Sequence, residues 1–437
     1  MIDWNPPPVP RKSQPSTATH QPPSLLRARF VVPIRRVPIE DGDVVVEGER
    51  IAAVGAWRWM RRRFSGHITD LGDSILLPGF INAHCHLDYT GMAGLFPPPK
   101  SFCAWIKSLT TEKSCWTGSD FAESWLVGAK MLLRSGTTTV LDVEAFPELL
   151  PDLWPTTPLR VISFLEMTGV RSRREPEAIL AEAVERIESL PASRCGAGLS
   201  PHAPYSTTPG LIKHVGTIAR RRKWRVVTHV AESATEFQMF KHGRGEMFDC
   251  LLRSRRDMSD CGGISPAQHL AKNGLLGPNL FAIHVNHLAH GDAALLARKR
   301  VSVVHCPRSH DYFGHERFPL RTLAKAGVNL CLGTDSLATV RKRPHQKVEL
   351  NMFDEMRTFA AKHPGVIPRR ILQMATVNGA RALALAGRAG ELVRGANADC
   401  IVLPCPRKVA DIFEVVLHHT GDASASMIAG QWAIAPN

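Results

Sequence analysis

The stretch ILLPGFINAHCHLD, residues 75–88, ends an apolar run with two histidines that lie one residue apart. In a β-strand, residues i and i+2 point to the same face, so His84 and His86 are expected to point together while Cys85 points away. Two neutral imidazoles aimed at one point favour a metal ion. A surface strand could also carry two histidines by chance, so the pair alone leaves both interpretations open.

Apolar, β-rich runs alternate with helical patterns through the middle of the chain. Helical patterns cover residues 120–136 and 175–190, among others. Strands that alternate with helices predict a (β/α)8 TIM barrel, whose chemistry gathers at the carboxyl ends of the strands. The expected strands are ILLPGFINAH (75–84), TTTVLDV (137–143), RVISFLEM (160–167), CGAGLSP (195–201), RVVTHV (225–230), LFAIHV (280–285), VSVVHCP (301–307) and VNLCLGTD (328–335).

Both ends of the chain have a different sequence pattern from the middle. Short strands with Gly and Asp at the turns are expected at 27–34 and 42–55, and a similar pattern returns at 397–404 and 422–435. We therefore predict a small β-sandwich domain built from both chain ends, beside the barrel. The predicted domains are a disordered Pro-rich leader over 1–24, the β-sandwich domain over 25–78 and 392–437, and the barrel over 79–391.

Composition and charge exclude several classes of protein. The 437 residues carry a formal net charge of +14, but Lys and Arg are spread along the chain in short runs, so no nucleic-acid partner is expected. No run of about 18 apolar residues is present, and the amino terminus lacks the apolar core of a secretory signal, so no membrane partner is expected either. Ten cysteines without a CxxC pair fit a reducing cytoplasm.

Metal-ligating and acid–base side chains recur where the predicted strands end. His84 and His86 close the first strand, and the fifth carries His229, followed three residues later by Glu232. His284 closes the sixth strand and Asp335 the eighth. Each residue alone has a structural explanation, such as a core histidine or a helix cap. A barrel brings all these strand ends to one mouth, so a single metal site explains every position at once.

The segments ILLPGFINAHCHLD, SPHAPYS, THVAES, VVHCPRSH and LGTDSLAT resemble the signatures of the amidohydrolase superfamily. The resemblance covers residues 25–437 and is greatest to the aminohydrolase branch with guanine deaminase, S-adenosylhomocysteine deaminase and the triazine hydrolases. It implies one divalent metal ion, zinc or iron, because CGAGLSPHAP lacks the lysine of binuclear members. The implied metal ligands are His84, His86, His229 and Asp335; Glu232 and His284 would handle protons, and His202 would contact the substrate.

Hydrolytic removal of an amino group from a heteroaromatic ring explains this set of residues. A divalent cation lowers the pKa of bound water from about 15.7 to ~7, which makes it a nucleophile. Asp335 is expected to bind the metal with one oxygen and to take a proton from water with the other, with His284 assisting. Protonated Glu232 could supply the ring nitrogen and then the departing ammonia, which favours deamination over dehalogenation.

Two further residues are candidates for substrate binding. Trp105, in the loop after the first strand, could stack on a heterocycle or pack within a lid. Arg308 lies in HCPRSHDYFGHERF (305–318), where relatives usually read HCPxSN, and could pair with an anionic group of the substrate or stay solvated. This form of the loop resembles enzymes that deaminate aminodeoxyfutalosine in menaquinone synthesis.

The sequence thus predicts a cytoplasmic, metal-dependent aminohydrolase acting on a small, purine-like heterocycle, with a homodimer left open. One alternative is hydrolysis of a cyclic amide or another amidine C–N bond by the same metal site. A second alternative is a catalytically inactive barrel that serves as a binding protein. The inactive barrel should lack at least one metal ligand, and the chain has all four.

Overall fold

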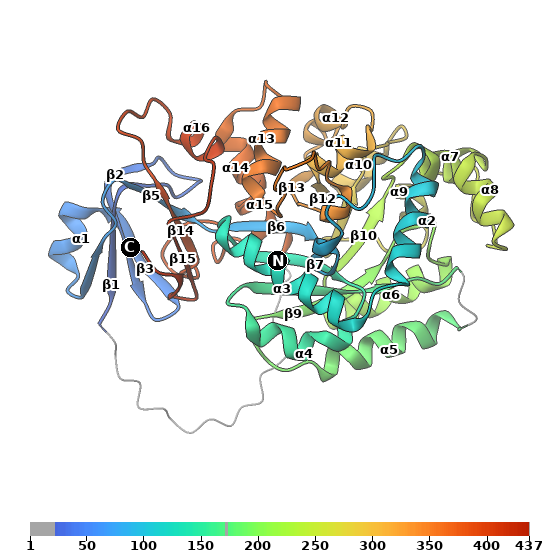
Figure 1. Cartoon of the computed structure of the whole chain (residues 1–437), viewed down its shortest axis with the longest axis horizontal. Coiled ribbons are helices and arrows are strands. Elements are labelled where there is room, and N and C mark those ends of the chain that lie inside the picture. The colour runs from blue at the N-terminus through green and yellow to red at the C-terminus, as the bar shows by residue number, and fades with distance from the viewer. Residues whose placement is uncertain (1–21, 171–173, 437) are drawn as a thin grey trace.

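The computed structural model describes residues 22–170 and 174–436, which form two eight-stranded sheets (Figure 1). In one sheet, β6 to β13 pair in parallel and in chain order, which confirms the predicted (β/α)8 barrel. The barrel strands are β6 (Phe80–Cys85), β7 (Thr137–Glu144), β8 (Arg160–Met167), β9 (Gly196–Pro201), β10 (Val226–Val230), β11 (Leu280–His284), β12 (Ser302–His305) and β13 (Asn329–Leu332).

Helices follow the barrel strands and cover the outside of the sheet (Figure 1). The predicted helices at 120–136 and 175–190 correspond to α3 and α5, and α3 begins with a capping box between Thr117 and Asp120. The helices of this part of the chain are α2 (Phe102–Lys113), α3 (Gly118–Arg134), α4 (Leu150–Leu153), α5 (Pro176–Ser189), α6 (Pro209–Arg222), α7 (Ala234–His242), α8 (Glu246–Arg253), α9 (Pro266–Lys272), α10 (Asp292–Arg298), α11 (Pro307–Phe313), α12 (Leu320–Lys325), α13 (Met352–Lys362), α14 (Pro368–Met374) and α15 (Val377–Ala382).

The barrel closes where its first and last strands meet. The backbone N–H groups of Thr334 and Asp335 donate to the carbonyl of His84 over 3.0 and 3.1 Å. The buried Asn82 side chain supports this junction, because its Nδ2 donates to Thr334 Oγ1 and its Oδ1 accepts from Thr334 N. Gly333 is required here, since a Cβ atom would lie 2.8 Å from the His84 carbonyl oxygen.

One predicted strand proves to be two. The run at 75–84 divides into β5 (Ser74–Pro78), which belongs to the smaller sheet, and β6, which begins the barrel. Pro78 has no N–H to donate, and Gly79 passes so close to Thr138 that a Cβ atom would lie 2.1 Å from its Cγ2. The Pro-Gly pair therefore carries the chain from one sheet to the other.

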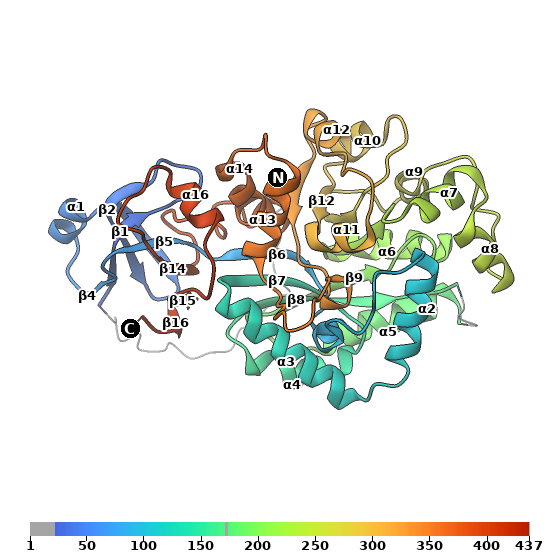
Figure 2. The ribbon, with the colours of Figure 1, turned by 45° about the horizontal axis from the view of Figure 1, so that its top comes forward.

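The second sheet is mixed and combines strands from both ends of the chain (Figures 1 and 2). β5 pairs with β1 on one side and with β14 on the other, and apolar side chains of β1, β2, β5, β14 and β15 form one core. Its other elements are α1 and α16. The bounds are β1 (Ser24–Val31), β2 (Ile39–Glu47), β3 (Arg50–Ala56), α1 (Trp57–Arg63), β4 (His67–Asp70), β14 (Cys400–Pro404), α16 (Ile412–Leu417), β15 (Ala425–Ile428) and β16 (Gln431–Ile434).

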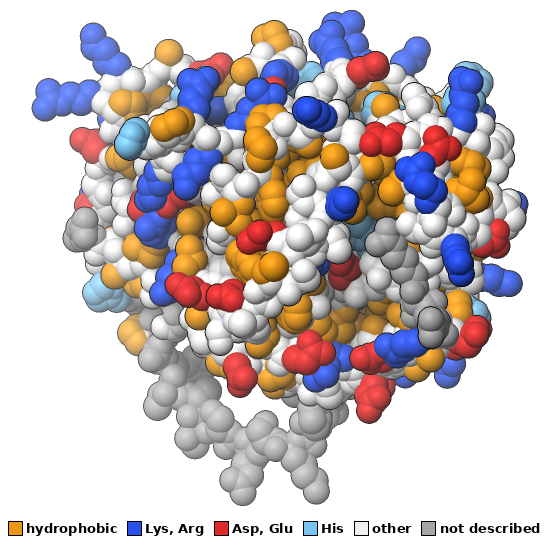
Figure 3. Space-filling view, turned by 45° about the vertical axis from the view of Figure 1, so that its right-hand side comes forward, with side chains coloured by type: hydrophobic (Ala, Val, Ile, Leu, Met, Phe, Trp, Pro, Cys, Tyr) orange, Lys and Arg blue, Asp and Glu red, His pale blue; other side chains and the backbone are white. Residues whose placement is uncertain are grey.

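The predicted leader lies outside the described residues up to residue 21, and β1 already begins at Ser24. Within the described ranges, no helix has the length and apolarity that crossing a bilayer requires. Figure 3 shows Lys and Arg side chains scattered among Asp and Glu over one face of the molecule, without a continuous basic field.

Replacing Asn82 should weaken the barrel closure. Asn82→Ala removes the two buried hydrogen bonds between Asn82 and Thr334, so we expect a loss of about 1–3 kcal/mol in the free energy of unfolding. Urea denaturation measures this loss. Gln431→Ala, at an exposed position of β16, should change stability by less than about 0.5 kcal/mol. Equal stability of both variants would show that the Asn82 bonds do not support the closure.

Candidate active site

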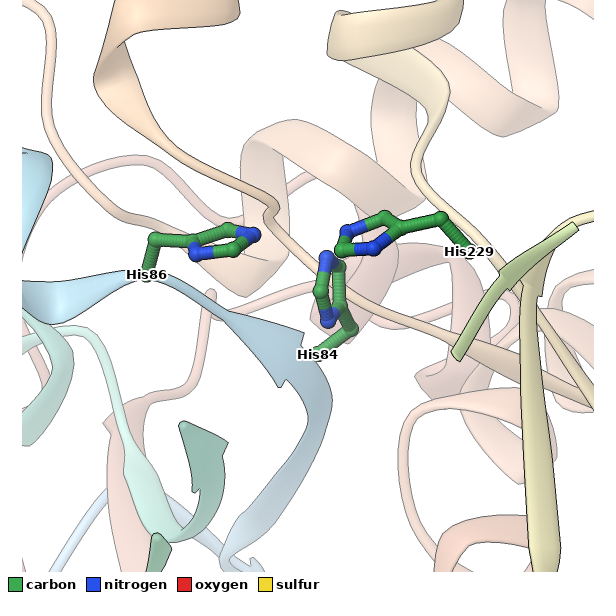
Figure 4. Close-up of side chains that lie close together, drawn as sticks. All are labelled: His84, His86 and His229. Carbon is green, nitrogen blue, oxygen red and sulfur yellow. The ribbon is translucent and has the colours of Figure 1, made fainter. Parts of the chain in front are cut away.

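Three histidines meet at the mouth of the barrel: His84 in β6, His86 just after the end of β6, and His229 in β10 (Figure 4). The ring centroids of His84 and His86 are 4.9 Å apart, and those of His84 and His229 are 5.0 Å apart. One ring nitrogen from each of the three residues lies within 4.8 Å of the others. All three side chains are buried, so this is a compact, dry cluster of imidazoles.

The histidine cluster has the donors that a divalent metal ion requires. Among the residues that the structure describes, neither ring nitrogen of His84 has a hydrogen-bond partner, and Nδ1 of His86 has none. His229 Nδ1 lies 2.9 Å from the carbonyl of His202 and donates to it, which leaves Nε2 as the lone-pair atom. Buried polar atoms are normally paired, so these free nitrogens fit metal ligands that share one ion.

Asp335 completes the cluster from the end of the eighth strand. Its Oδ1 lies 3.6 Å from His84 Nε2 and 3.7 Å from His86 Nε2. Its Oδ2 accepts from the hydroxyls of Ser309, over 2.6 Å, and Thr339, over 3.2 Å. Oδ1 therefore faces the histidines while Oδ2 is held by two hydroxyls, and the proton-accepting role expected of Asp335 stays a prediction.

Glu232 and His284 form the acid–base part of the site. Glu232 Oε1 lies 3.4 Å from His284 Nε2, and these atoms group with Asp335 within 4.8 Å of one another. Burial raises the pKa of Glu232 well above its usual range, and the nearby charges of Asp335 and Glu236 add to this effect. Burial lowers the pKa of His284 to about 3, so this imidazole is neutral near pH 7. The pair thus offers a protonated acid beside a neutral base.

Two neighbouring side chains fix the backbone around Glu232. The carboxylate of Glu236 accepts from the backbone N–H groups of Ala231 and Glu232, over 3.0 and 2.9 Å. Asn286 Nδ2 donates to the carbonyl of Glu232, and Asn286 Oδ1 in turn lies 3.0 Å from Nδ1 of His310. His310 is the residue that departs from the HCPxSN pattern. The unusual loop is therefore linked to the backbone of Glu232 through Asn286.

A cavity of about 390 Å³ opens beside the histidine cluster. His202 lines it just after β9, and its Nδ1 lies 2.7 Å from Ser206 Oγ. Trp105 of α2 lines the outer part together with Leu251 of α8, and these two helices lie side by side (Figures 1 and 2). The structure therefore brings both predicted substrate contacts to the cavity of the metal cluster.

Arg308, the third predicted substrate contact, does not line this cavity. Its Nε donates to Glu355 Oε1 over 2.5 Å, and its backbone N–H donates to Oε2 of the same residue. Its Nη1 donates to the carbonyl of Glu349, so the guanidinium is committed to a buried ion pair. The prediction that Arg308 meets an anionic group of the substrate is wrong for this reason.

The cavity also contains two charged residues that the sequence analysis missed. Glu166 is the penultimate residue of the third barrel strand, β8, and Lys113 ends α2, where its Nζ contacts the hydroxyl of Tyr89. The rule that site residues gather at the carboxyl ends of strands applies to Glu166, since RVISFLEM carries an acid one residue before its end. Lys113 carries no comparable signal, because a lysine in the last turn of a helix is common on any surface.

The comparisons with known proteins agree with this geometry. Residues 75–432 match the model of the amidohydrolase family. The chain belongs to the amidohydrolase family. It is 30% identical to a 5-methylthioadenosine/S-adenosylhomocysteine deaminase of Syntrophobacter fumaroxidans over 384 residues, which cover 83% of this chain and 80% of that protein. It is 28% identical to an aminodeoxyfutalosine deaminase of Deinococcus radiodurans, over 81% of this chain and 84% of that protein.

A solved structure supports the assignment to this family. An adenosine deaminase from Xanthomonas campestris, determined with bound zinc, superposes on this amidohydrolase with a TM-score of 0.81. The two chains are 25% identical, and the match covers 94% of this chain and 92% of the other. The predicted resemblance to the amidohydrolase superfamily and the prediction of a metal-dependent hydrolytic enzyme are both confirmed.

Arg308 should matter for stability rather than for substrate binding. Arg308→Met removes the partner of the fully buried Glu355 carboxylate, so we expect a loss of about 3–5 kcal/mol in the free energy of unfolding, measured in urea. The KM of the variant should stay within about twofold of wild type, because the guanidinium does not line the cavity. Arg321→Met, an exposed change on α12, is the matched control. A raised KM with unchanged stability would show that Arg308 does contact the substrate.

Proposed function

We propose that this amidohydrolase removes the amino group of a purine-like heterocycle by hydrolysis, with one divalent metal ion held by His84, His86, His229 and Asp335. The observation that carries the proposal is a protonated acid, Glu232, held against a neutral base, His284, beside a buried cluster of three histidines that could hold a metal ion. The relatives named above are deaminases of adenine-containing compounds, which supports the same reaction here.

A bound divalent cation supplies a water of lowered pKa, which the reaction needs as its nucleophile. His284, neutral and 3.4 Å from Glu232, orients that water and takes a proton from it. Glu232, protonated because of its burial, donates its proton to the ring nitrogen next to the carbon under attack. The proton that His284 took passes to the leaving amino group through the Glu232 carboxylate 3.4 Å away, so that ammonia departs as a neutral molecule. The carboxylate regains its own proton from the new hydroxyl as that group becomes a carbonyl.

The surroundings of the cavity support a small, largely apolar heterocycle as the substrate. Trp105, Ile106, Leu109 and Leu251 give the cavity a substantial apolar lining. We propose zinc as the resident metal, since three imidazoles and one carboxylate are typical zinc ligands and the Xanthomonas relative holds zinc. A cytoplasmic location, a homodimer and the domain boundaries at 24, 78 and 391 stay predictions.

The proposed ligand set is tested by the metal content of a variant. His229→Ala removes one of the imidazoles, so the purified protein should bind zinc at least about tenfold more weakly than wild type. Metal analysis after dialysis against a graded chelator measures this difference. His214→Ala, at a half-exposed position on α6, should retain wild-type metal. Unchanged zinc binding in His229→Ala would remove His229 from the ligand set.

Ammonia release tests the reaction and the acid together. We expect zinc-loaded wild-type enzyme to release ammonia from at least one of adenosine, 5′-deoxyadenosine, methylthioadenosine, aminodeoxyfutalosine, guanine and a pterin. Glu232→Gln should retain the metal and lose at least about 100-fold in kcat, since it cannot donate the proton that the ring nitrogen needs. Full turnover by Glu232→Gln would reject the acid role of Glu232. If the metal-loaded wild type released no ammonia from any of these compounds, deamination of purine-like heterocycles would be rejected.

A further inference from the structure

We propose that His287, His310 and His315 form a second metal site, which binds a divalent transition-metal ion such as zinc outside the active-site cavity. None of the three histidines lines that cavity. The ion would tie the segment after β11 to the loop after β12. This inference goes beyond the proposed function, because it depends neither on a substrate nor on the metal ligands of the active site.

The three imidazoles come from two segments that meet in the fold. His287 follows the end of β11 by three residues, His310 lies in α11, and His315 comes just after that helix. The ring centroids of His310 and His315 are 5.4 Å apart, and those of His287 and His315 are 6.2 Å apart. In the histidine cluster of the active site, the three centroid distances are 4.9, 5.0 and 5.6 Å. The second group is slightly more open, so its side chains would rotate toward a bound ion.

Two of these rings carry a buried nitrogen that lacks a partner. Among the residues that the structure describes, none forms a hydrogen bond with Nε2 of His287 or with Nε2 of His315, although both atoms are buried. Buried polar atoms are normally paired, so each unpaired one calls for an explanation. His84 of the active site has the same property. A metal ion explains both nitrogens at once, because imidazole nitrogen is a common zinc ligand.

His310 is already oriented in the way that a metal ligand requires. Its Nδ1 lies 3.0 Å from Oδ1 of Asn286, while Nδ2 of Asn286 donates to the carbonyl of Glu232. Oδ1 of Asn286 is an acceptor only, so Nδ1 of His310 carries the proton and Nε2 keeps its lone pair. Metal-ligating histidines usually donate their other ring N–H to an oxygen atom, which fixes both the tautomer and the ring.

The three rings are neutral near pH 7, and a negative charge lies close to them. Burial lowers the pKa of His310 to about 4 and the pKa of His315 to about 3. Burial also lowers the pKa of His287, and the negative charge of Glu316 acts in the opposite direction. Neutral imidazoles bind a metal ion without first losing a proton. The exposed Glu316 would offset part of the charge of a dication at this place.

The proposed ion is connected to the acid of the active site through the protein. His310 contacts Asn286, and Asn286 holds the carbonyl of Glu232. An ion bound to His310 and His315 would restrict movement of the loop over residues 305–318 and would thereby keep Asn286 in place. The second ion would therefore stabilise the loop, and it would contact neither the substrate nor the attacking water.

The experiment counts zinc ions per chain by titrating the metal-free, full-length protein with zinc chloride against a chromophoric chelator. Wild type should bind about two equivalents, one in each site. His315→Ala, His287→Gln and His310→Asn should each bind the second equivalent at least about tenfold more weakly and keep the first. His310→Asn introduces the residue of the HCPxSN pattern and keeps an amide beside Asn286. His67→Ala, at an exposed position of β4, is the matched control and should bind both equivalents.

Retention of the first equivalent shows that a variant is folded, and hydrogen exchange gives a second readout. Zinc should slow amide exchange over residues 307–318 in wild type but not in His315→Ala. His229→Ala should keep the second equivalent, which separates the two sites. If wild type binds only the equivalent that depends on His315, the metal site of the proposed function fails and this inference stands. A single equivalent that depends on His229, or a second equivalent that survives all three substitutions, would overturn the second site.

Discussion

The two hydrogen bonds from Thr334 N and Asp335 N to the carbonyl of His84 connect the fold to the chemistry. They join the first strand of the barrel to the last, and they do so at the two residues whose side chains face the metal position. A histidine and a carboxylate from opposite ends of a 250-residue segment are thereby held with Nε2 and Oδ1 3.6 Å apart. Any loosening of the closure would separate the two proposed ligands, so we expect stability and metal affinity to depend on the same backbone contacts.

The rest of the site is arranged around this junction by side chains that hold backbone rather than substrate. Ser309 and Thr339 fix Oδ2 of Asp335, which directs Oδ1 toward His84 and His86. Glu236 and Asn286 hold both sides of the Glu232 peptide. A reacting group that is positioned in this way loses little freedom when substrate binds, which is how preorganised sites lower barriers.

The sequence was sufficient to predict the barrel because its signal is repeated along the chain. Eight β-rich runs alternate with amphipathic helices, and histidines and acids recur at the same end of several strands. The division of the run at 75–84 was not predicted, because Pro78 and Gly79 leave an apolar pattern unbroken while the chain changes sheets. The ion pair of Arg308 could not be predicted for another reason. Its partner Glu355 lies 47 residues away on α13, and no local sequence pattern links the two.

The strand ends also show where the barrel stores strain. His284, Val285 and Asp335 have φ values of 69°, 51° and 54°, in the left-handed region that residues with a Cβ atom avoid. Each such residue costs about 1–3 kcal/mol and persists only where the surrounding structure fixes it. Here the fixing contacts are the bond from Val285 N to the carbonyl of Val230 and that from Asp335 N to His84. The strands therefore turn sharply at the point where they leave the sheet, and this turn is what aims an imidazole and a carboxylate at the same small volume.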